Sequence, residues 1–296
     1  MANHNAYRIV SRNGDCKYSV GTASKVVSVA GVAFGGRQPV VIAGPCTVES
    51  LEQTLEIALE VKNCGAHMLR GGAFKPRTSP YDFQGLGEEG LKILAAVREQ
   101  TGLPVVTEVL DVRLVELVGR YADMLQVGSR NMQCFPLLTE LGKLGKPVLL
   151  KRGMAATLQE WLCAAEYIAK EGNTQIVLCE RGIRSFGAGE YSRFCLDLSV
   201  VKAVREATYL PVIVDPSHAT GRADMVPWAA QAALGFGADG LLIEVMGART
   251  PRSQLRCDPD QAIRPATFQK LMNKIHKMGK TEEEDLMERK TSAALA

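Results

Sequence analysis

The chain has 296 residues, of which 46% are hydrophobic and 23% are charged, and its formal net charge is only +3. The length suits one α/β barrel of about 250 residues, and the composition is that of a globular protein with a large core. A near balance of charge without a long Lys/Arg run, and without an apolar stretch of roughly 20 residues, gives no support for nucleic acid or a membrane as partner.

Short apolar runs alternate with amphipathic stretches through the centre of the sequence. The strand-like runs are Val40–Ala43, Met68–Gly71, Val105–Val109, Met124–Val127, Val148–Lys151, Ile176–Cys179, Val212–Val214 and Gly240–Val245. Helical patterns lie between them, for example Leu51–Asn63, Glu88–Thr101, Leu158–Glu171 and Leu196–Ala207. This alternation predicts βα units and a parallel sheet. Eight such units in roughly 240 residues favour a closed (β/α)8 TIM barrel over an open sheet.

Two segments flank the predicted barrel of residues 40–279. Residues 1–39 contain two β-like stretches, Tyr7–Val10 and Val26–Val29, between Gly-rich turns. They are too few for a domain of their own and predict a short N-terminal β-hairpin that caps the bottom of the barrel. Residues 280–296 form a charged tail, which we expect to be disordered.

Cysteine usage and the N-terminus bear on the compartment. The chain has eight cysteines but no C-x-x-C pair. In a chain of this length without a secretory signal, most of them are expected to be buried small hydrophobes rather than disulfides. The sequence therefore predicts a reduced, cytoplasmic protein.

Polar groups follow every predicted strand. In an α/β barrel the catalytic groups come from the carboxyl ends of the strands and from the loops after them. The groups found there, in strand order, are Cys46; Arg70, Lys75 and Arg77; Glu108; Ser129 and Arg130; Lys151 and Arg152; Glu180 and Arg181; Asp215 and His218; and Glu244. Because these positions converge on one rim, the sequence predicts a single site there.

One chemical set among these groups has the character of a metal site. It comprises Cys46, His218, Glu244 and an acid in the following loop, either Asp258 or Asp260. Thiolate, imidazole and carboxylate together suit a divalent transition metal such as Mn, Fe, Co or Zn, and the mixture does not select one of them.

The second set is cationic. Its members are Arg70, Lys75, Arg77, Arg130, Lys151, Arg181 and Arg184. Such a ring of cations would repel itself unless something anionic bound there, and Arg and Lys match phosphate and carboxylate groups. We therefore expect one or two small-molecule substrates that carry several negative charges.

Several motifs resemble a known enzyme family. They are G-P-C-T-V-E-S (44–50), L-R-G-G-A-F-K-P-R-T-S-P (69–80), V-G-S-R-N-M (127–132), L-L-K-R-G-M (149–154), C-E-R-G-I-R (179–184), V-D-P-S-H-A-T-G (214–221) and L-I-E-V (242–245). Over roughly residues 36–275 the chain resembles 3-deoxy-7-phosphoheptulonate (DAHP) synthase of the smaller class, which is related to 3-deoxy-octulosonate 8-phosphate synthase. The resemblance implies condensation of phosphoenolpyruvate with erythrose 4-phosphate, the first step of the shikimate pathway to aromatic amino acids.

The resemblance also implies a role for individual residues. The metal ligands match Cys46, His218, Glu244 and Asp258, so the family pattern selects Asp258 over Asp260. The phosphoenolpyruvate site matches Arg70, Lys75, Arg130, Lys151 and Arg181, with the backbone near Ser129. The erythrose 4-phosphate site matches Arg77 and Thr78. In the mechanism, Lys75 is a candidate proton donor, and Glu108 and His218 are candidates for handling the water.

Two stretches depart from the family pattern. Met246 stands where a His is usual, and Ser192–Cys195, which includes Phe194, stands where an Arg-Asn-Thr run is common. Both belong to loops over the expected site. They leave the metal and phosphoenolpyruvate roles intact and bear on the aldehyde, so a specialised enzyme that uses a modified sugar phosphate is an alternative.

Three competing functions also fit parts of this sequence. The nearest is that of a related synthase that makes octulosonate phosphate or a sialic acid. A different class of enzyme is a Schiff-base aldolase with Lys151 as the nucleophile. The third is a barrel that senses sugar phosphates without turnover. Because members of the synthase family are commonly homo-oligomers, the resemblance also implies that this chain forms one.

Overall fold

The computed structural model describes residues 7–12 and 25–278, and these form a closed barrel of eight parallel strands. The strands are β3 (Val40–Gly44), β4 (Met68–Arg70), β5 (Val105–Glu108), β6 (Met124–Val127), β7 (Val148–Lys151), β8 (Ile176–Glu180), β9 (Val212–Val214) and β10 (Gly240–Glu244). Each strand pairs with the next along the chain, and β10 closes the ring against β3 with Glu244 opposite Gly44. The predicted TIM barrel is confirmed.

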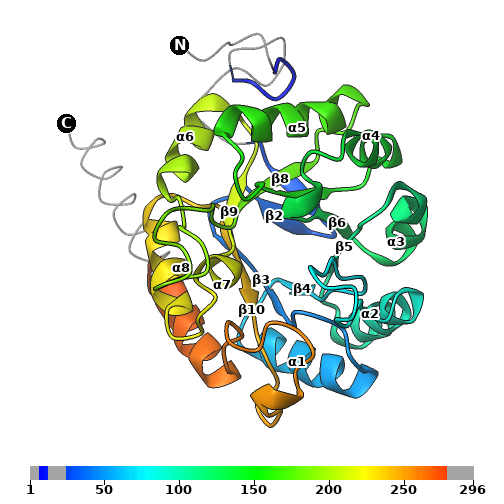
Figure 1. Cartoon of the computed structure of the whole chain (residues 1–296), viewed down its shortest axis with the longest axis vertical. Coiled ribbons are helices and arrows are strands. Elements are labelled where there is room, and N and C mark those ends of the chain that lie inside the picture. The colour runs from blue at the N-terminus through cyan, green and yellow to red at the C-terminus, as the bar shows by residue number, and fades with distance from the viewer. Residues whose placement is uncertain (1–6, 13–24, 279–296) are drawn as a thin grey trace, which may run out of the picture.

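Helices surround the strands in chain order (Figure 1). They are α1 (Leu51–Asn63), α2 (Glu88–Thr101), α3 (Val115–Tyr121), α4 (Phe135–Leu144), α5 (Leu158–Lys170), α6 (Ser199–Ala207), α8 (Val226–Gly235) and a last helix described over residues 265–278. A short helix, α7 (Pro216–Thr220), directly follows β9. There are also three short 3-10 helices among the described residues, namely η1 (Val112–Leu114), η2 (Ser129–Asn131) and η3 (Arg252–Gln254).

Local sequence accounts for the helix ends. The Ser50 hydroxyl accepts from the backbone N–H of Gln53 at the start of α1. Thr157 and Glu160 form a reciprocal capping box at the start of α5, which satisfies donors that a helix N-terminus otherwise leaves unpaired. Gly102 ends α2 in the left-handed conformation that glycine adopts without strain.

Two apolar cores hold the barrel together. One lies between the strands and the surrounding helices and contains residues such as Trp161, Leu178 and Phe268. The other fills the barrel interior, with alternate strand residues such as Ile42 and Leu149. Because parallel strands in a barrel are buried on both faces, their sequences are continuous apolar runs, which is why the strand positions were predictable.

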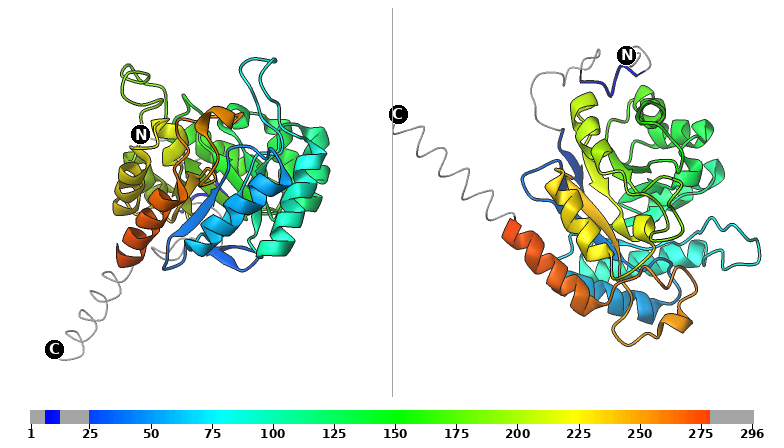
Figure 2. Two further views of the ribbon diagram at one scale, coloured as in Figure 1. Left: turned by 90° about the horizontal axis from the view of Figure 1, so that it is seen from below. Right: turned by 60° about the vertical axis from the view of Figure 1, so that its left-hand side comes forward.

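An N-terminal hairpin closes one end of the barrel. Its strands are β1 (Val27–Val29) and β2 (Val32–Phe34), which pair antiparallel. Val27, Val29 and Phe34 belong to the interior core with Ile42 and Leu149, so the hairpin plugs the barrel at the amino-terminal ends of the strands. On the opposite side, the loop between β4 and α2 stands out from the barrel (Figure 2, left).

The prediction of a strand at Tyr7–Val10 is wrong. The backbone N–H groups of Arg8, Ile9 and Val10 all donate to the carboxylate of Glu166 on α5. A side chain thus takes the place of a neighbouring strand, and the partner of Val27–Val29 is Val32–Phe34 instead.

Two further expectations concern the ends of the chain and membranes. The tail at 280–296 lies outside the described residues, as do residues 1–6 and 13–24 of the predicted N-terminal cap. Among the described helices, none combines the length and apolar character needed to cross a membrane.

Candidate active site

The site begins where the interior face of each strand changes from apolar to polar. Side chains alternate between the two faces of a strand, so the residue two positions after an interior one also points inward. The last apolar interior residues are Ile42, Met68, Val106, Met124, Leu149, Cys179, Ile213 and Leu242. The residues two positions later are Gly44, Arg70, Glu108, Gln126, Lys151, Arg181, Asp215 and Glu244. One polar layer therefore covers the apolar interior.

Glycines make room for this layer. A Cβ at Gly44 would lie 2.1 Å from the carbonyl oxygen of Arg70, and the φ of Gly44 is 155°. A Cβ at Gly128 would lie 2.0 Å from Oε1 of Glu108. Any larger side chain at either position would displace Arg70 or Glu108 from the rim.

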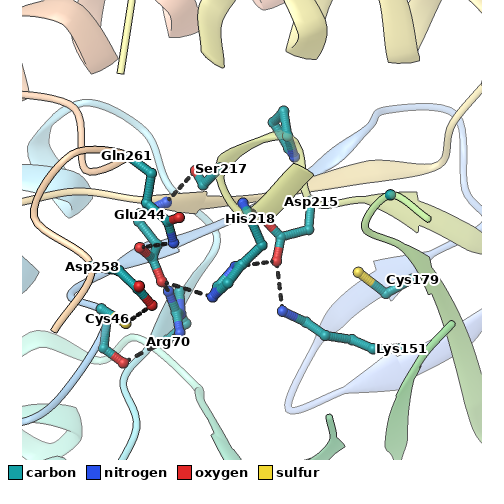
Figure 3. A network of polar contacts seen from close by, with 12 residues as sticks. Cys46, Arg70, Lys151, Cys179, Asp215, Ser217, His218, Glu244, Asp258 and Gln261 are labelled. Carbon is teal, nitrogen blue, oxygen red and sulfur yellow. Dashed lines mark hydrogen bonds and ion pairs between the residues drawn. The ribbon is translucent and has the colours of Figure 1, made fainter. Parts of the chain in front are cut away.

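The predicted metal ligands come together above β3 and β10. Sγ of Cys46, one imidazole nitrogen of His218 and one carboxylate oxygen of Glu244 all lie within 4.8 Å of one another. Nε2 of His218 is 3.2 Å from Oε1 of Glu244, and Oδ2 of Asp258 is 3.5 Å from Sγ of Cys46. Figure 3 shows these side chains turned toward one region. Their donor chemistry fits a divalent transition metal.

Asp215 orients the histidine. Its Oδ2 lies 2.7 Å from Nδ1 of His218, and its Oδ1 accepts from the His218 backbone N–H at the start of α7. Oδ2 also forms a 2.5 Å ion pair with Nζ of Lys151 (Figure 3). With Nδ1 engaged in this way, Nε2 is directed at Glu244 and the metal-type cluster, the arrangement in which histidine ligates a metal.

The ionisation states suit ligation. Burial lowers the pKa of His218 against the opposing effect of Asp215, which favours the neutral imidazole. Burial alone would raise the pKa of Glu244, but positive charge on the neighbouring His218 and Arg70 lowers it. When His218 is neutral, the buried Arg70 still favours the ionised carboxylate. Arg70 forms a buried ion pair with Glu244, and Gln261 donates to the other carboxylate oxygen at 2.6 Å.

Cys257 is a member of this cluster that the sequence analysis did not identify. Its Sγ lies 3.1 Å from Sγ of Cys46 and 3.5 Å from Oδ2 of Asp258. The hydrogen bond between the two thiols, together with burial, raises the pKa of Cys46, and the same hydrogen bond lowers that of Cys257 to about 7. Nη1 of Arg77 donates to Sγ of Cys257 at 2.7 Å. Its position directly before Asp258 was the available signal.

A cavity of about 270 Å³ opens beside the metal-type cluster, with His218 and Asp258 in its wall. Its cationic lining comprises Lys75, Arg77, Arg130, Lys151, Arg181 and Arg193, against the acids Asp82, Glu108 and Asp258. Oγ of Ser129 and Nη1 of Arg181 are buried there and have no hydrogen-bond partner among residues 7–12 and 25–278. Buried donors without partners are costly, so the cavity is built for a ligand that accepts hydrogen bonds.

Not every predicted residue lines this cavity. Thr78 does, and its Oγ1 accepts from Arg130 at 3.4 Å. Arg70 lies buried beneath the cavity against Glu244. Arg184 is exposed and is not among the lining residues, so its role stays a prediction.

Arg152 and Glu180 have a different place from the other strand-end groups. Nη1 of Arg152 lies 3.0 Å from Glu180 and 2.9 Å from Asp197, at the start of α6. Neither Arg152 nor Glu180 lines the cavity. Each directly follows an inward-pointing residue, Lys151 or Cys179, so its side chain points outward to the helix layer. There the two residues connect β7 and β8 to α6.

The two departures from the family pattern occupy different positions. The Phe194 ring lies in the cavity wall with the guanidinium of Arg181 4.0 Å from its centroid, a cation–π arrangement. Met246 is buried beside Cys46 and Cys257. Phe194 can therefore contact a substrate directly, whereas Met246 borders the thiols.

Comparison with known proteins shows the family of this chain. Residues 18–282 match the model of the family described as "DAHP synthetase I family". A phospho-2-dehydro-3-deoxyheptonate aldolase of Thermotoga maritima is 45% identical over 253 residues, 86% of this chain and 73% of the relative. A 2-dehydro-3-deoxyphosphooctonate aldolase of Syntrophotalea carbinolica is 36% identical over 256 residues, 80% of this chain and 87% of the relative.

Solved structures give the same result. The crystal structure of DAHP synthase from Thermotoga maritima superposes with a TM-score of 0.85 at 41% identity and covers 93% of this chain and 77% of its own. A truncated form of that organism's synthase gives 0.83 at 39% identity, over 93% and 97% of the two chains. A family match over most of the sequence, a shared barrel and identities above one third together place this chain in the DAHP synthetase I family.

Proposed function

We propose that this protein condenses phosphoenolpyruvate with erythrose 4-phosphate to give 3-deoxy-D-arabino-heptulosonate 7-phosphate and phosphate. The observation that carries the proposal is the adjacency of two features. A cationic cavity with unpaired buried donors shares His218 and Asp258 with a cluster of metal-type ligands. The first feature suits two phosphorylated substrates, and the second suits activation of a carbonyl group beside them.

In this proposal Cys46, His218, Glu244 and Asp258 would hold a divalent metal, of which Mn, Fe, Co and Zn are the candidates. When bound, the ion would supply Lewis acidity toward the carbonyl group of the aldose phosphate. Asp215 keeps the imidazole of His218 oriented for this task through its 2.7 Å contact with Nδ1.

The cations hold the two substrates together. Arg181, Lys151, Arg130 and the donors of Ser129 bind the phosphate and carboxylate of phosphoenolpyruvate, and Arg77 and Thr78 hold the aldose phosphate. Two dianionic phosphates repel each other in water, so their joint binding beside fixed cations contributes both proximity and electrostatic stabilisation.

The chemistry joins carbon 3 of phosphoenolpyruvate to the carbonyl carbon of the aldehyde. Positive charge develops at carbon 2, water adds there, and the resulting intermediate releases inorganic phosphate to leave the 2-keto acid. Glu108 and His218 both line the cavity. Both ring nitrogens of His218 are already engaged by carboxylates, so Glu108 is the better candidate for handling the water. Burial opposes the charged form of Lys75, but the negative charge of Cys46 and Cys257 as thiolates raises its pKa, which favours the ammonium form.

The test is phosphate release from phosphoenolpyruvate with erythrose 4-phosphate or arabinose 5-phosphate, each with Mn²⁺ and with a chelator. We expect metal-dependent turnover with the four-carbon sugar. Turnover with arabinose 5-phosphate alone would assign the octulosonate reaction instead. Tight binding of phosphoenolpyruvate without turnover on either sugar would favour a sugar-phosphate sensor.

A Schiff-base mechanism has less support. Nζ of Lys151 is engaged in a 2.5 Å ion pair with Asp215, whereas a Schiff base requires a free neutral amine. Borohydride reduction in the presence of substrate would trap such an adduct on Lys151, and we expect no trapping. The homo-oligomer and the cytoplasmic location remain predictions from the sequence.

A further inference from the structure

The thiol of Cys257 has no role in the proposed function. Its side chain is only 4% exposed, and its Sγ lies 3.1 Å from Sγ of Cys46. Sγ of Cys46, Sγ of Cys257 and one oxygen of Asp258 all lie within 4.8 Å of one another. Cys46 therefore belongs to two groups of metal-type ligands, one with His218 and Glu244 and one with Cys257 and Asp258.

The backbone is shaped to turn two consecutive side chains toward Cys46. Asp258 has a φ of 43°, in the left-handed region that few residues other than glycine occupy. Asp tolerates this conformation better than most residues, but strained backbone persists mainly where surrounding contacts enforce it, often at functional sites. Here the enforced outcome is that the thiol of Cys257 and the carboxylate of Asp258 reach the same cluster.

Nearby cations compensate a second anionic sulfur. Nη1 of Arg77 donates to Sγ of Cys257 at 2.7 Å, and Nζ of Lys75 lies 3.2 Å from Sγ of Cys46. Hydrogen bonds from cations stabilise a thiolate, which is the form that binds metals. Arg77 also lines the cavity, so the second sulfur lies between the metal-type cluster and the cationic cavity.

From this geometry we propose that Cys257 is a second thiolate ligand of the metal centre. The proposal rests on the metal site of the proposed function and adds to it a choice among metals. A pair of thiolates favours softer and borderline ions, so the site prefers Zn²⁺, Fe²⁺ and Co²⁺ to Mn²⁺ more strongly than a site with one sulfur would. Each thiol releases its proton as the metal–sulfur bond forms.

X-ray absorption fine structure of the wild-type protein loaded with one equivalent of Zn²⁺ is the direct test. We expect two sulfur neighbours at about 2.3 Å, the usual Zn–S distance. A single sulfur neighbour overturns the assignment of Cys257 and leaves the proposed function standing. Failure to bind one equivalent of Zn²⁺, Co²⁺ or Mn²⁺ would instead contradict the metal site of the proposed function.

A variant provides an independent measurement. Cys257→Ser loaded with Co²⁺ should retain about half of the sulfur-to-cobalt charge-transfer absorbance of the wild type, since one of two thiolates remains. Its affinity for Zn²⁺ should fall about tenfold or more, with a smaller change for Mn²⁺. Full absorbance and unchanged Zn²⁺ affinity would overturn the proposal.

The matched control is Cys64→Ser, which removes a thiol at the end of α1. It should leave both the absorbance and the metal affinities unchanged. Circular dichroism establishes whether Cys257→Ser is folded, and if it is not, the wild-type absorption measurement still decides the number of sulfur ligands.

Discussion

At the scale of single residues, the site depends on groups that orient other groups. Asp215 is fully buried and accepts from the backbone N–H and Nδ1 of His218 and from Nζ of Lys151. One carboxylate thereby fixes a metal-type ligand and a cation of the cavity wall. The two sets identified in the sequence are thus physically joined at a residue that the sequence analysis placed at the rim without a role.

Replacement of this carboxylate tests the connection. In Asp215→Asn the side-chain NH2 group must face a donor, either the backbone N–H of His218 or Nζ of Lys151 together with Nδ1 of His218. At least one of these hydrogen bonds is lost in either orientation, and the negative charge beside the imidazole is lost in both. We expect metal affinity to fall about 10–100-fold, as for other partners of ligating histidines. The metal affinity is measured by titrating metal into the metal-free protein in competition with a chromophoric chelator.

The control is Asp224→Asn, which removes a carboxylate that pairs with Arg222 at the surface. It should bind metal as the wild type does. Equal affinities of the Asp215 and Asp224 variants would show that His218 needs no support from Asp215.

At the scale of elements, a helix start is tied to a strand end by one acid. Oδ1 of Asp197 accepts from the backbone N–H of Val200 and from the hydroxyl of Ser199, and Oδ2 pairs with Arg152 after β7. Burial would raise the pKa of Asp197, but the hydrogen bonds from Ser199 and Arg152 lower it. The ionised carboxylate therefore helps to hold α6 against the barrel.

This depressed pKa has a consequence for acid stability. A carboxyl whose pKa is lower in the folded than in the unfolded state stabilises the fold above the unfolded value of 3.8, and the stabilisation is lost as pH falls below it. The melting temperature should therefore drop less between pH 5 and pH 3 for Asp197→Asn than for the wild type. Glu116→Gln, at an exposed position of α3, should show the full wild-type drop. Identical drops in all three proteins would contradict the role of Asp197.

The hairpin β1–β2 gives a second prediction at this scale. Phe34 is fully buried in the interior core, so Phe34→Ala should lower the free energy of unfolding by about 3 to 5 kcal/mol. Val26, just before β1, is 53% exposed, so Val26→Ala should change the free energy of unfolding little. Denaturant unfolding measures both. A small loss for Phe34→Ala would mean that the hairpin is not needed to seal the barrel.

Elements with both faces buried were predictable from the sequence, and those set by loop geometry were not. The eight barrel strands are apolar on both faces, so their positions were predicted to within a residue or two. The hairpin partner Val32–Phe34 was missed because the turn between the strands is Ala30-Gly31, and Ala30 adopts a φ of 46° that alanine seldom occupies. An alternating run on each side of a two-residue turn containing glycine was the usable signal.

The same difference between strands and loops separates the site residues that were predictable from those that were not. Strand alternation carries Arg70, Glu108, Lys151 and Glu244 to the rim, so their convergence follows from the sequence once the strands are placed. Cys257 reaches the cluster only through an irregular loop, and such a loop has no periodicity from which its path can be inferred.

At the scale of the whole molecule, the barrel concentrates cations at one mouth although the net charge of the chain is only +3. Without a ligand these cations repel one another, and Arg181 keeps a buried N–H group that has no acceptor in the described part of the chain. The fold therefore loses some stability at the proposed substrate site, which is a common cost of function.

Phosphoenolpyruvate should accordingly stabilise the metal-free protein. A ligand that binds only the folded state adds RT ln(1 + [L]/Kd), about 2.7 kcal/mol at a concentration of 100 Kd. Arg181→Met removes the cation, its unpaired donor and the guanidinium contact with Phe194, and keeps an unbranched side chain at this position. We expect the melting temperature of this variant without ligand to equal or exceed that of the ligand-free wild type. We also expect the variant to lose most of the increase in melting temperature that phosphoenolpyruvate produces in the wild type.

Arg120→Met is the control, because Arg120 is exposed on α3 away from the cavity, and its shift should equal that of the wild type. Thermal melts with and without phosphoenolpyruvate, at low and high salt, compare the three proteins. A full shift in Arg181→Met would place the ligand elsewhere. A variant less stable than the wild type without ligand would show that Arg181 supports the fold, and the strain attributed to the cation ring would then have to lie among its other members.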